Sequence, residues 1–174
     1  AGILTISGNQ AVTDIETSVS TLDLATAATS ITEADDVTLT DSELSGQFDL
    51  SAGAIELNNL NAGSNAVNIV ASGAITDGND GVNNVTAGIL TISGNQAVTD
   101  IETSVSTLDL ATAATSITEA DGVTLTDSEL SGQFDLNAGA IELNTLTAGS
   151  NAVNIVASGA ITDGNAAVNN VTAG

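Results

Sequence analysis

The sequence of 174 residues contains no Lys, Arg, His, Cys, Pro, Met, Trp or Tyr, and its formal net charge is −22 because all 22 charged residues are Asp or Glu. Without Lys or Arg the chain has no basic patch to neutralise phosphates, so we predict that it binds neither nucleic acid nor anionic lipid directly. Without His or Cys it cannot build the usual zinc, haem or iron–sulfur sites, or a Ser-His or Cys-His nucleophile.

Only Phe48 and Phe134 are aromatic. A pair of carboxylates could still act as acid and base, as in glycoside hydrolysis, but two rings offer almost no platform on which a sugar could stack. We therefore predict that the chain is not an enzyme. It also has no run of about 18 apolar residues and no positively charged signal-peptide segment, so we expect no direct membrane insertion.

The content of 42% hydrophobic and 13% charged residues predicts a folded chain. The 35 residues at 1–35 return unchanged at 87–121, so we assign one repeat to 1–86, a second to 87–172 and the start of a third to 173–174. None of the six differences between the copies replaces Val, Ile, Leu or Phe: they are Asp36/Gly122, Ser51/Asn137, Asn59/Thr145, Asn61/Thr147, Asp80/Ala166 and Gly81/Ala167. The apolar skeleton is therefore the same in both copies.

A shorter apolar–polar–apolar unit recurs inside the repeat, in steps of 18, 26, 19 and 23 residues. Its anchors in the first copy are Leu4-Thr-Ile6, Leu22-Asp-Leu24, Phe48-Asp-Leu50 and Val67-Asn-Ile69. Apolar residues alternate with Thr, Asp, Asn or Glu, and Gly, Asn, Asp or Ser clusters separate the runs, which is typical of short strands. We predict an all-β fold, a right-handed parallel β-helix (β-solenoid) with about four three-strand coils per repeat and about eight coils in total. The absence of Pro agrees with ladders bonded on both sides.

Three stretches between residues 48 and 95 carry a resemblance to a known family: FDLSAGAIELNNLNAG, VNIVASGAITDGND and VNNVTAGILTISGN. The order of apolar, polar, Ala and Gly residues in these stretches resembles the repeat region of filamentous haemagglutinin-like adhesins, which are large secreted or surface proteins of Gram-negative bacteria. The resemblance implies a right-handed parallel β-helix shaft and a location outside the cell or on its surface. It implies no binding site.

A ladder of carboxylates is the first candidate site. Alignment of the second strands puts a carboxylate at one shared position in three of the four coils: Asp14, Glu33 and Asp77, repeated as Asp100, Glu119 and Asp163. Like charges stacked about 4.8 Å apart repel by roughly 1–3 kcal/mol. Because the chain has no basic residue, we expect this repulsion to be reduced by divalent cations, by raised carboxylate pKa values or by side chains that point apart into water.

Calcium is the cation that such oxygen ligands favour. The residues that could bind it are Asp14, Glu33, Asp35, Asp36, Asp77, Asp80, Asp100, Glu119, Asp121 and Asp163. The second copy lacks the carboxylates of Asp36 and Asp80, which argues against identical sites in every repeat, and neither the RTX nor the EF-hand spacing is present. The alternative is a solvated acidic surface with diffusely associated cations, and we predict no required cofactor.

Two weaker patterns remain. Outward Thr at positions such as Thr13, Thr32 and Thr76 could suggest an ice-binding face, but β-propensity alone selects Thr on a solvated strand. Asn84-Val85-Thr86 and Asn170-Val171-Thr172 match the acceptor pattern for N-glycosylation.

The chain starts on a coil and stops two residues into a further copy, so we expect either a piece of a longer array or identical units that stack end to end. We predict a structural repeat segment of an extracellular or cell-surface fibre. Its partners would be copies of itself or neighbouring repeats, with divalent cations in addition. The alternatives are an adhesin stalk that binds carbohydrate or protein of a host or neighbouring cell, and a carbohydrate-active enzyme on the same scaffold.

Overall fold

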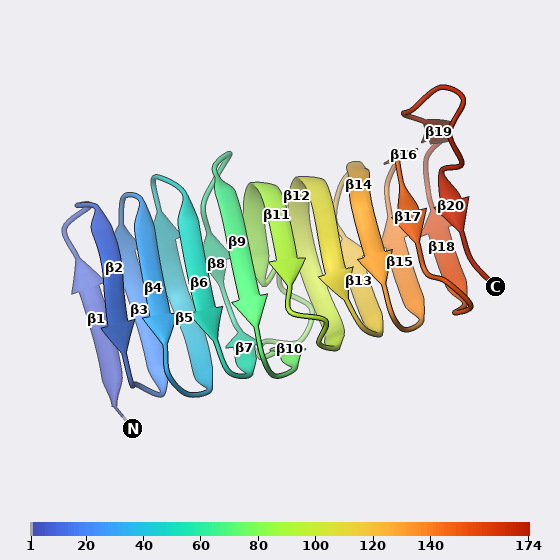
Figure 1. Ribbon diagram of the computed structural model, residues 1–174. Helices are drawn as coiled ribbons and strands as arrows, with labels where there is room; N and C mark the ends of the chain where they lie inside the picture. The colour runs from blue at the N-terminus through green and yellow to red at the C-terminus, as the bar shows by residue number, and fades with distance from the viewer. Residues whose placement is uncertain (1) are drawn as a thin grey trace.

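The computed structural model describes residues 2–174, which contain twenty strands and no helix (Figure 1). The strands that lie wholly in the first repeat are β1 (Ile3–Ser7), β2 (Val12–Thr17), β3 (Thr21–Thr26), β4 (Thr29–Glu33), β5 (Val37–Leu44), β6 (Phe48–Ala52), β7 (Ile55–Leu57), β8 (Leu60–Asn61), β9 (Ala66–Ala71) and β10 (Ile75–Asp77). The others are β11 (Val85–Ser93), β12 (Val98–Thr112), β13 (Thr115–Glu119), β14 (Val123–Leu130), β15 (Phe134–Ala138), β16 (Ile141–Leu143), β17 (Leu146–Thr147), β18 (Val153–Ala157), β19 (Ile161–Asp163) and β20 (Val171–Thr172). Within residues 2–174 there is consequently no helix that could cross a membrane.

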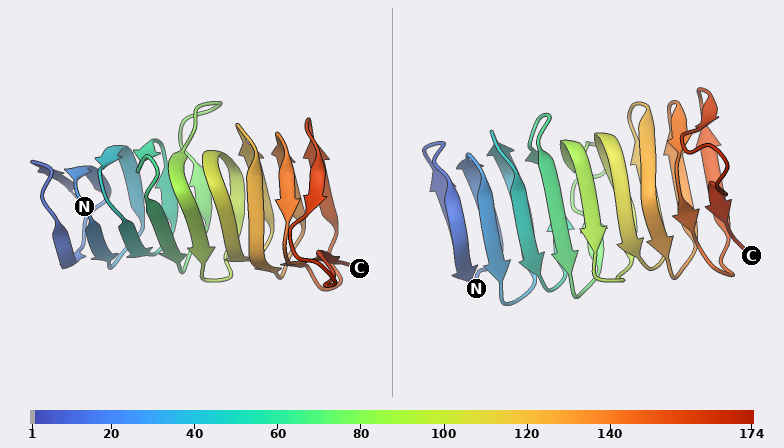
Figure 2. Two further views of the ribbon diagram at one scale, coloured as in Figure 1. Left: turned by 90° about the horizontal axis from the view of Figure 1, so that it is seen from above. Right: turned by 45° about the horizontal axis from the view of Figure 1, so that its top comes forward.

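Every strand pairing is parallel and joins one coil to the next. In Figure 1 the chain runs up the far side in β1 and down the near side in β2 while it advances from left to right, which is a right-handed winding. The two termini lie at opposite ends of the shaft in all views (Figure 2). The predicted right-handed β-solenoid is confirmed.

Two columns of strands form the long sides of the solenoid. One column stacks Leu4 on Leu22 and continues through β5 and β7. The other stacks β2, β4, β6 and β9 and then receives Leu90 on Val67. Leu90 is the counterpart of Leu4 one repeat later, yet it lies in the opposite column. One repeat therefore makes about four and a half turns.

The solenoid as a whole has about nine turns, so the prediction of about eight was too low. The error lies in the 26-residue step from Leu22 to Phe48. Leu22 pairs with Leu39, whereas Phe48 lies in the other column and pairs with Thr29. This step is thus one and a half turns and not one coil. The number of strands per turn also varies, since β3 and β4 complete one turn whereas β7, β8 and β9 share another.

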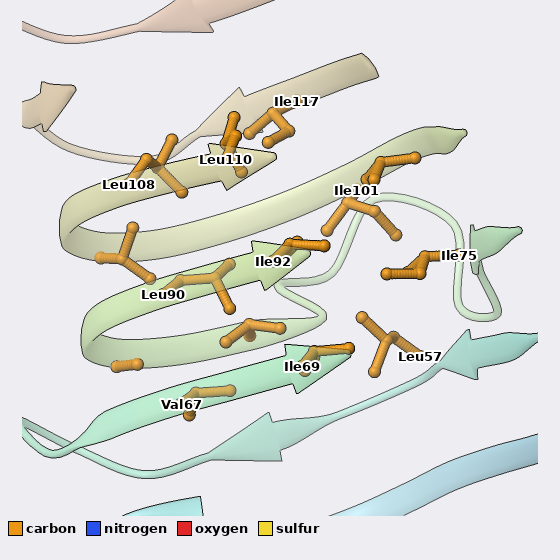
Figure 3. Packing of buried hydrophobic residues seen from close by; sticks show 14 of the residues in the cluster. Leu57, Val67, Ile69, Ile75, Leu90, Ile92, Ile101, Leu108, Leu110 and Ile117 are labelled. Atoms are coloured by element: carbon orange, nitrogen blue, oxygen red, sulfur yellow. The ribbon is translucent and has the colours of Figure 1, made fainter. Parts of the chain in front are cut away.

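The core is a continuous set of aliphatic stacks along the axis. Figure 3 shows side chains from successive coils that face a common interior, among them Ile69 of β9, Ile92 of β11 and Leu110 of β12. These three are buried and follow one another in one column across the boundary between the repeats. Each fully buried side chain of this kind contributes on the order of 1.5–3 kcal/mol. The repeat boundary at residues 86–87 does not interrupt the core.

Candidate functional site

The predicted carboxylate ladder does not form. A β-bulge shifts the register between β2 and β4, so that Val12 pairs with Thr29 but Thr17 pairs with Glu33. The extra residue belongs to the segment that contains Asp14, whose φ is 49°. Asp14 consequently has no directly opposed residue on β4. The alignment of second strands was wrong because it ignored this bulge and the additional half turn.

The two bulge carboxylates, Asp14 and Asp100, are exposed and contact hydroxyl groups of the next coil. Asp14 Oδ1 accepts a hydrogen bond of 3.3 Å from Ser30 Oγ, and Asp100 Oδ1 accepts one of 3.1 Å from Ser116 Oγ. Asp100 has a φ of 54°, in the left-handed region that Asp and Asn tolerate better than other non-glycine residues. A role in the backbone geometry of the bulge therefore explains both residues.

Glu33 and Glu119 point into the solenoid, where their residues are only 4% and 3% exposed. Glu119 accepts hydrogen bonds from Thr103 Oγ1 at 2.7 Å, from the Val105 amide at 3.1 Å and from the Asp121 amide at 3.2 Å. Glu33 has the same set of donors one repeat earlier. A buried carboxylate with these partners joins two coils, and its oxygens already have protein donors.

Burial raises the pKa of the Glu119 carboxyl, and the hydrogen bonds from Thr103, Asp121 and Val105 oppose this shift. A raised carboxylate pKa was one of the expected ways to reduce the repulsion between stacked carboxylates. The physical cause at Glu119 is desolvation, since no stacked like charge leads the shift. The alternation of the strand contained the signal for this position, because Glu119 lies two residues after the buried Ile117.

The acidic residues that follow these glutamates are exposed and bond to neighbouring coils. Asp35 Oδ2 accepts from Ser18 Oγ at 2.8 Å, and Asp121 Oδ2 accepts from Ser104 Oγ at 3.3 Å. Asp36 Oδ1 accepts from the Ala54 amide at 2.7 Å. The cluster predicted as Glu33, Asp35 and Asp36 is therefore divided between an inward carboxylate and two that bond along the surface.

Asn84 is the residue that sequence reasoning missed. It is fully buried at the repeat boundary, and its Nδ2 donates at 2.7 Å to both the Leu57 carbonyl and Asp77 Oδ1. Its Oδ1 accepts from the Glu102 amide at 2.7 Å, and its own amide donates to the Glu102 carbonyl at 2.7 Å. The side chain thus joins three successive turns. Asn84 belongs to one of the two matches to the acceptor pattern for N-glycosylation, and its side chain is enclosed in the folded chain.

The acidic loop around Asn84 contains the two remaining predicted ligands of the first copy. Asp77 Oδ1 also accepts from the Asn79 amide at 2.7 Å, and Asp80 is exposed. Among residues 2–174, Glu102 Oε2 is the one buried side-chain polar atom without a hydrogen-bond partner. Burial raises the pKa of Glu102, as do the nearby carboxylates of Asp77, Asp100 and Asp80, and a hydrogen bond with its own backbone lowers it.

The second copy repeats the loop with fewer carboxylates, since Ala166 replaces Asp80. Asp163 Oδ1 accepts from Asn170 Nδ2 at 2.9 Å and from the Asn165 amide at 2.8 Å, and these bonds lower the pKa of Asp163. No three His, Cys, Asp or Glu side chains within residues 2–174 form a group that could hold a metal ion. Calcium binding by the predicted residues therefore stays a prediction.

The comparisons with known proteins give no relative. No protein-family model, no curated protein and no solved structure matches this chain. The resemblance to filamentous haemagglutinin-like adhesins consequently stays a prediction. The buried Glu33, Asn84 and Glu119 have one property in common, which is that they join neighbouring coils by hydrogen bonds.

Proposed function

We propose that this chain is a structural segment of an extracellular or cell-surface fibre, in which it forms a durable acidic shaft. The observation that supports this proposal is the continuity of ladder and core across the repeat boundary. Leu90 of β11 pairs with Val67 in the preceding coil and with Leu108 in the following one, and all three are fully buried. A solenoid that extends without interruption through repeats with the same apolar residues can be lengthened by adding repeats.

The buried polar groups support a mechanical function. Each inward carboxylate and each buried Asn bonds two or more turns, so that sliding one coil past another would expose unpaired groups at a cost of about 1–3 kcal/mol each. Glu33, Asn84 and Glu119 occur at intervals along the axis and are each bonded to neighbouring turns. Such groups fix the register of a β-sheet that aliphatic stacks alone would specify less sharply.

The acidic surface without Lys or Arg suits a protein that is exposed outside the cell. A protease that cuts after Lys or Arg finds no site in this sequence, and like charges keep neighbouring shafts apart at low salt. Divalent cations would screen the surface and bring shafts together. The residue pattern that resembles the repeat regions of filamentous haemagglutinin-like adhesins supports a location outside the cell or on its surface.

Tandem arrays of two, four and six repeats test the proposal by electron microscopy. The shaft should lengthen by about 22 Å per repeat, which is four and a half turns at about 4.8 Å. Rods whose length does not grow with repeat number, or compact particles, would contradict the proposal. Antibody labelling of intact source cells tests the location, and labelling that requires permeabilised cells would contradict it.

A further inference from the structure

The sequence contains four Asp-Gly pairs, at which a protein chain can rearrange its own backbone. The amide nitrogen of the Gly attacks Cγ of the Asp side chain. The nitrogen loses its proton and the carboxyl loses its hydroxyl, which leave together as water, and a cyclic imide (succinimide) remains. Water then opens this ring at either carbonyl, which restores Asp or gives isoaspartate, a residue linked to the next one through its side-chain carboxyl. The pairs are Asp77-Gly78, Asp80-Gly81, Asp121-Gly122 and Asp163-Gly164.

The attack requires that both the peptide group and the side chain can move. The main chain must rotate until the amide nitrogen of the Gly faces Cγ of the Asp, and Gly allows this because it has no Cβ. Hydrogen bonds that hold either group have to open first. Two such bonds slow the reaction by a factor of about ten or more. The hydrogen bonds of the folded chain therefore rank the four pairs.

The pair Asp77-Gly78 is held by three hydrogen bonds. The Gly78 amide, which would be the attacking group, donates to the Leu57 carbonyl at 2.9 Å. Asp77 Oδ1 accepts at 2.7 Å from both the Asn79 amide and Asn84 Nδ2. The attacking nitrogen and the carboxylate are thus both fixed by protein partners.

The equivalent pair of the second copy is held in the same way. The Gly164 amide donates to the Leu143 carbonyl at 2.9 Å. Asp163 Oδ1 accepts from the Asn165 amide at 2.8 Å and from Asn170 Nδ2 at 2.9 Å. We therefore expect the pair Asp163-Gly164 to react as slowly as its counterpart.

The pair Asp121-Gly122 is held through its peptide oxygen and its side chain. The Asp121 carbonyl, which belongs to the peptide group that would have to rotate, accepts from the Gly139 amide at 2.7 Å. Asp121 Oδ2 accepts from Ser104 Oγ at 3.3 Å. Rotation of this peptide would break a bond between two coils.

The pair Asp80-Gly81 differs from the other three. Both residues are exposed, and within residues 2–174 no hydrogen bond holds the Asp80 side chain, the Asp80 carbonyl or the Gly81 amide. Gly81 has a φ of 73°, and no heavy atom lies within 4 Å of the place where a Cβ would be. The peptide group can consequently rotate, and the succinimide ring has room to form.

The residues on either side of this pair confine the rearrangement to the loop. Asn79 Nδ2 donates to the Asn58 carbonyl before the pair, and Asn84 bonds to Leu57 and Glu102 after it. Isoaspartate lengthens the main chain by one carbon atom between Asn79 and Asn84. β10 and β11 need not shift, so the ladder and the core of the shaft remain.

We propose that Asp80-Gly81 is a site of spontaneous isoaspartate formation in the folded chain, and that hydrogen bonds protect the other three Asp-Gly pairs. Water is the one reactant that the chain does not supply. The second copy has Ala166-Ala167 at the equivalent place and therefore lacks this site. The reaction goes beyond the structural function proposed above and does not depend on it.

Peptide mapping of the aged chain tests the proposal. The intact, folded chain is incubated at neutral pH and then cut by a protease specific for Glu, which gives separate fragments for the first, middle and last of these loops. Electron-transfer fragmentation locates isoaspartate within each fragment. Isoaspartate should accumulate at Asp80 at least about tenfold faster than at the other three pairs. The fragments are 57–102, 120–129 and 143–174.

The same chain in concentrated urea is the control, because unfolding removes the protecting hydrogen bonds. All four pairs should then react at comparable rates. The incubation continues until the urea sample contains isoaspartate at every pair. Equal rates at the four pairs in the folded chain, or no isoaspartate at Asp80 by that time, would overturn the proposal.

Two matched variants exchange the loop sequences between the copies. Ala166→Asp with Ala167→Gly creates the pair in the second copy, where Ala167 already has a φ of 67°. Asp80→Ala with Gly81→Ala gives the first copy the loop that the second copy already carries. Isoaspartate should appear at position 166 in the first variant and be absent from position 80 in the second, with circular dichroism that matches the parent chain. A transferred pair that reacts at least about tenfold more slowly than Asp80 would contradict the assignment to this loop.

Discussion

Asn84 and Glu102 exchange two hydrogen bonds of 2.7 Å across the boundary between the two repeats. Asn84 is the last-turn polar residue of the first copy, and Glu102 belongs to the second strand of the second copy. The same Asn also holds the Leu57 carbonyl and Asp77 of its own repeat. One buried amide therefore couples the folding of one repeat to that of the next.

Asn84→Ala should lower the free energy of unfolding by about 2–4 kcal/mol, because it leaves several buried backbone and carboxylate groups without partners. Asn170→Ala is the matched control, since Asn170 has the same local bonds but lies in the last turn. Its effect should be smaller. Urea unfolding followed by circular dichroism measures both, and equal effects would show that the bonds to Glu102 contribute little.

Acidification should stabilise this protein. The pKa values of Glu119 and Glu102 are raised in the folded chain, so folding favours their protonated forms. The contribution of each group is complete below the pKa of the unfolded chain and is lost as pH rises through the raised pKa of the folded chain. The unfolding midpoint should therefore rise as pH falls from 7 towards the ordinary Glu range, and the reduced net charge acts in the same direction.

Glu119→Gln separates the effect of the raised pKa of a buried carboxyl from the effect of net charge. The amide can donate to the Thr103 hydroxyl and still accept from the Val105 and Asp121 amides, so the variant should fold. Its unfolding midpoint should depend less on pH than that of the parent chain. Glu142→Gln, which removes one exposed charge, is the control. An identical pH dependence in both variants would assign the effect to net charge alone.

The fold was predictable because its rules are local and repeated. Period-two alternation identified the strands, and the identity of Leu, Ile, Val and Phe between the copies identified the core positions, such as Phe48 and Phe134, which are fully buried. The turn count was not predictable from alternation alone, because alternation does not show which column a strand joins. Val37-Thr-Leu39 has the same apolar–polar–apolar form as the four anchors and begins a further turn, since Leu39 pairs with Leu22.

The polar sites were harder to predict because partner and orientation depend on register. Glu33 follows the inward Ile31 by two residues, so alternation alone placed it inside, but a charged residue is usually assigned to the surface. Asn84 gave no such signal, since the loop before β11 has no alternation. Its role depends on Leu57 and Glu102, which lie 27 and 18 residues away.

The effect of a substitution at Asp100 on stability should depend on whether the new residue adopts a positive φ, and less on the loss of the charge. Its φ of 54° is readily adopted by Gly and Asn but not by β-branched residues. Asp100→Asn and Asp100→Gly should change the free energy of unfolding by less than about 1 kcal/mol, and Asp100→Val should lower it by about 1–2 kcal/mol. Thermal unfolding compares the three. A large loss in the Asn variant would point instead to the carboxylate.

Calcium and magnesium should raise the melting temperature by similar amounts. Without a group of three acidic side chains among residues 2–174 that could hold a metal, screening of the surface charge is the mechanism expected, and screening depends on ionic charge. Asp80→Ala tests the acidic loop near Glu102 and should leave the calcium effect unchanged. A calcium effect that exceeds the magnesium effect and disappears in the Asp80 variant would establish a specific site.

Equivalent surface positions of successive repeats should alternate between the two sides of a long array. Thr5 and Thr91 occupy the same place in their repeats, but Thr5 belongs to the column of β3 and Thr91 to the column of β9. This follows from the half turn that each 86-residue repeat adds. A cysteine at this one position in every repeat of a six-repeat array, labelled with gold, should give particles that alternate across the shaft at intervals of about 22 Å. Labels that all lie along one side would require a whole number of turns per repeat and would contradict the arrangement of columns described above.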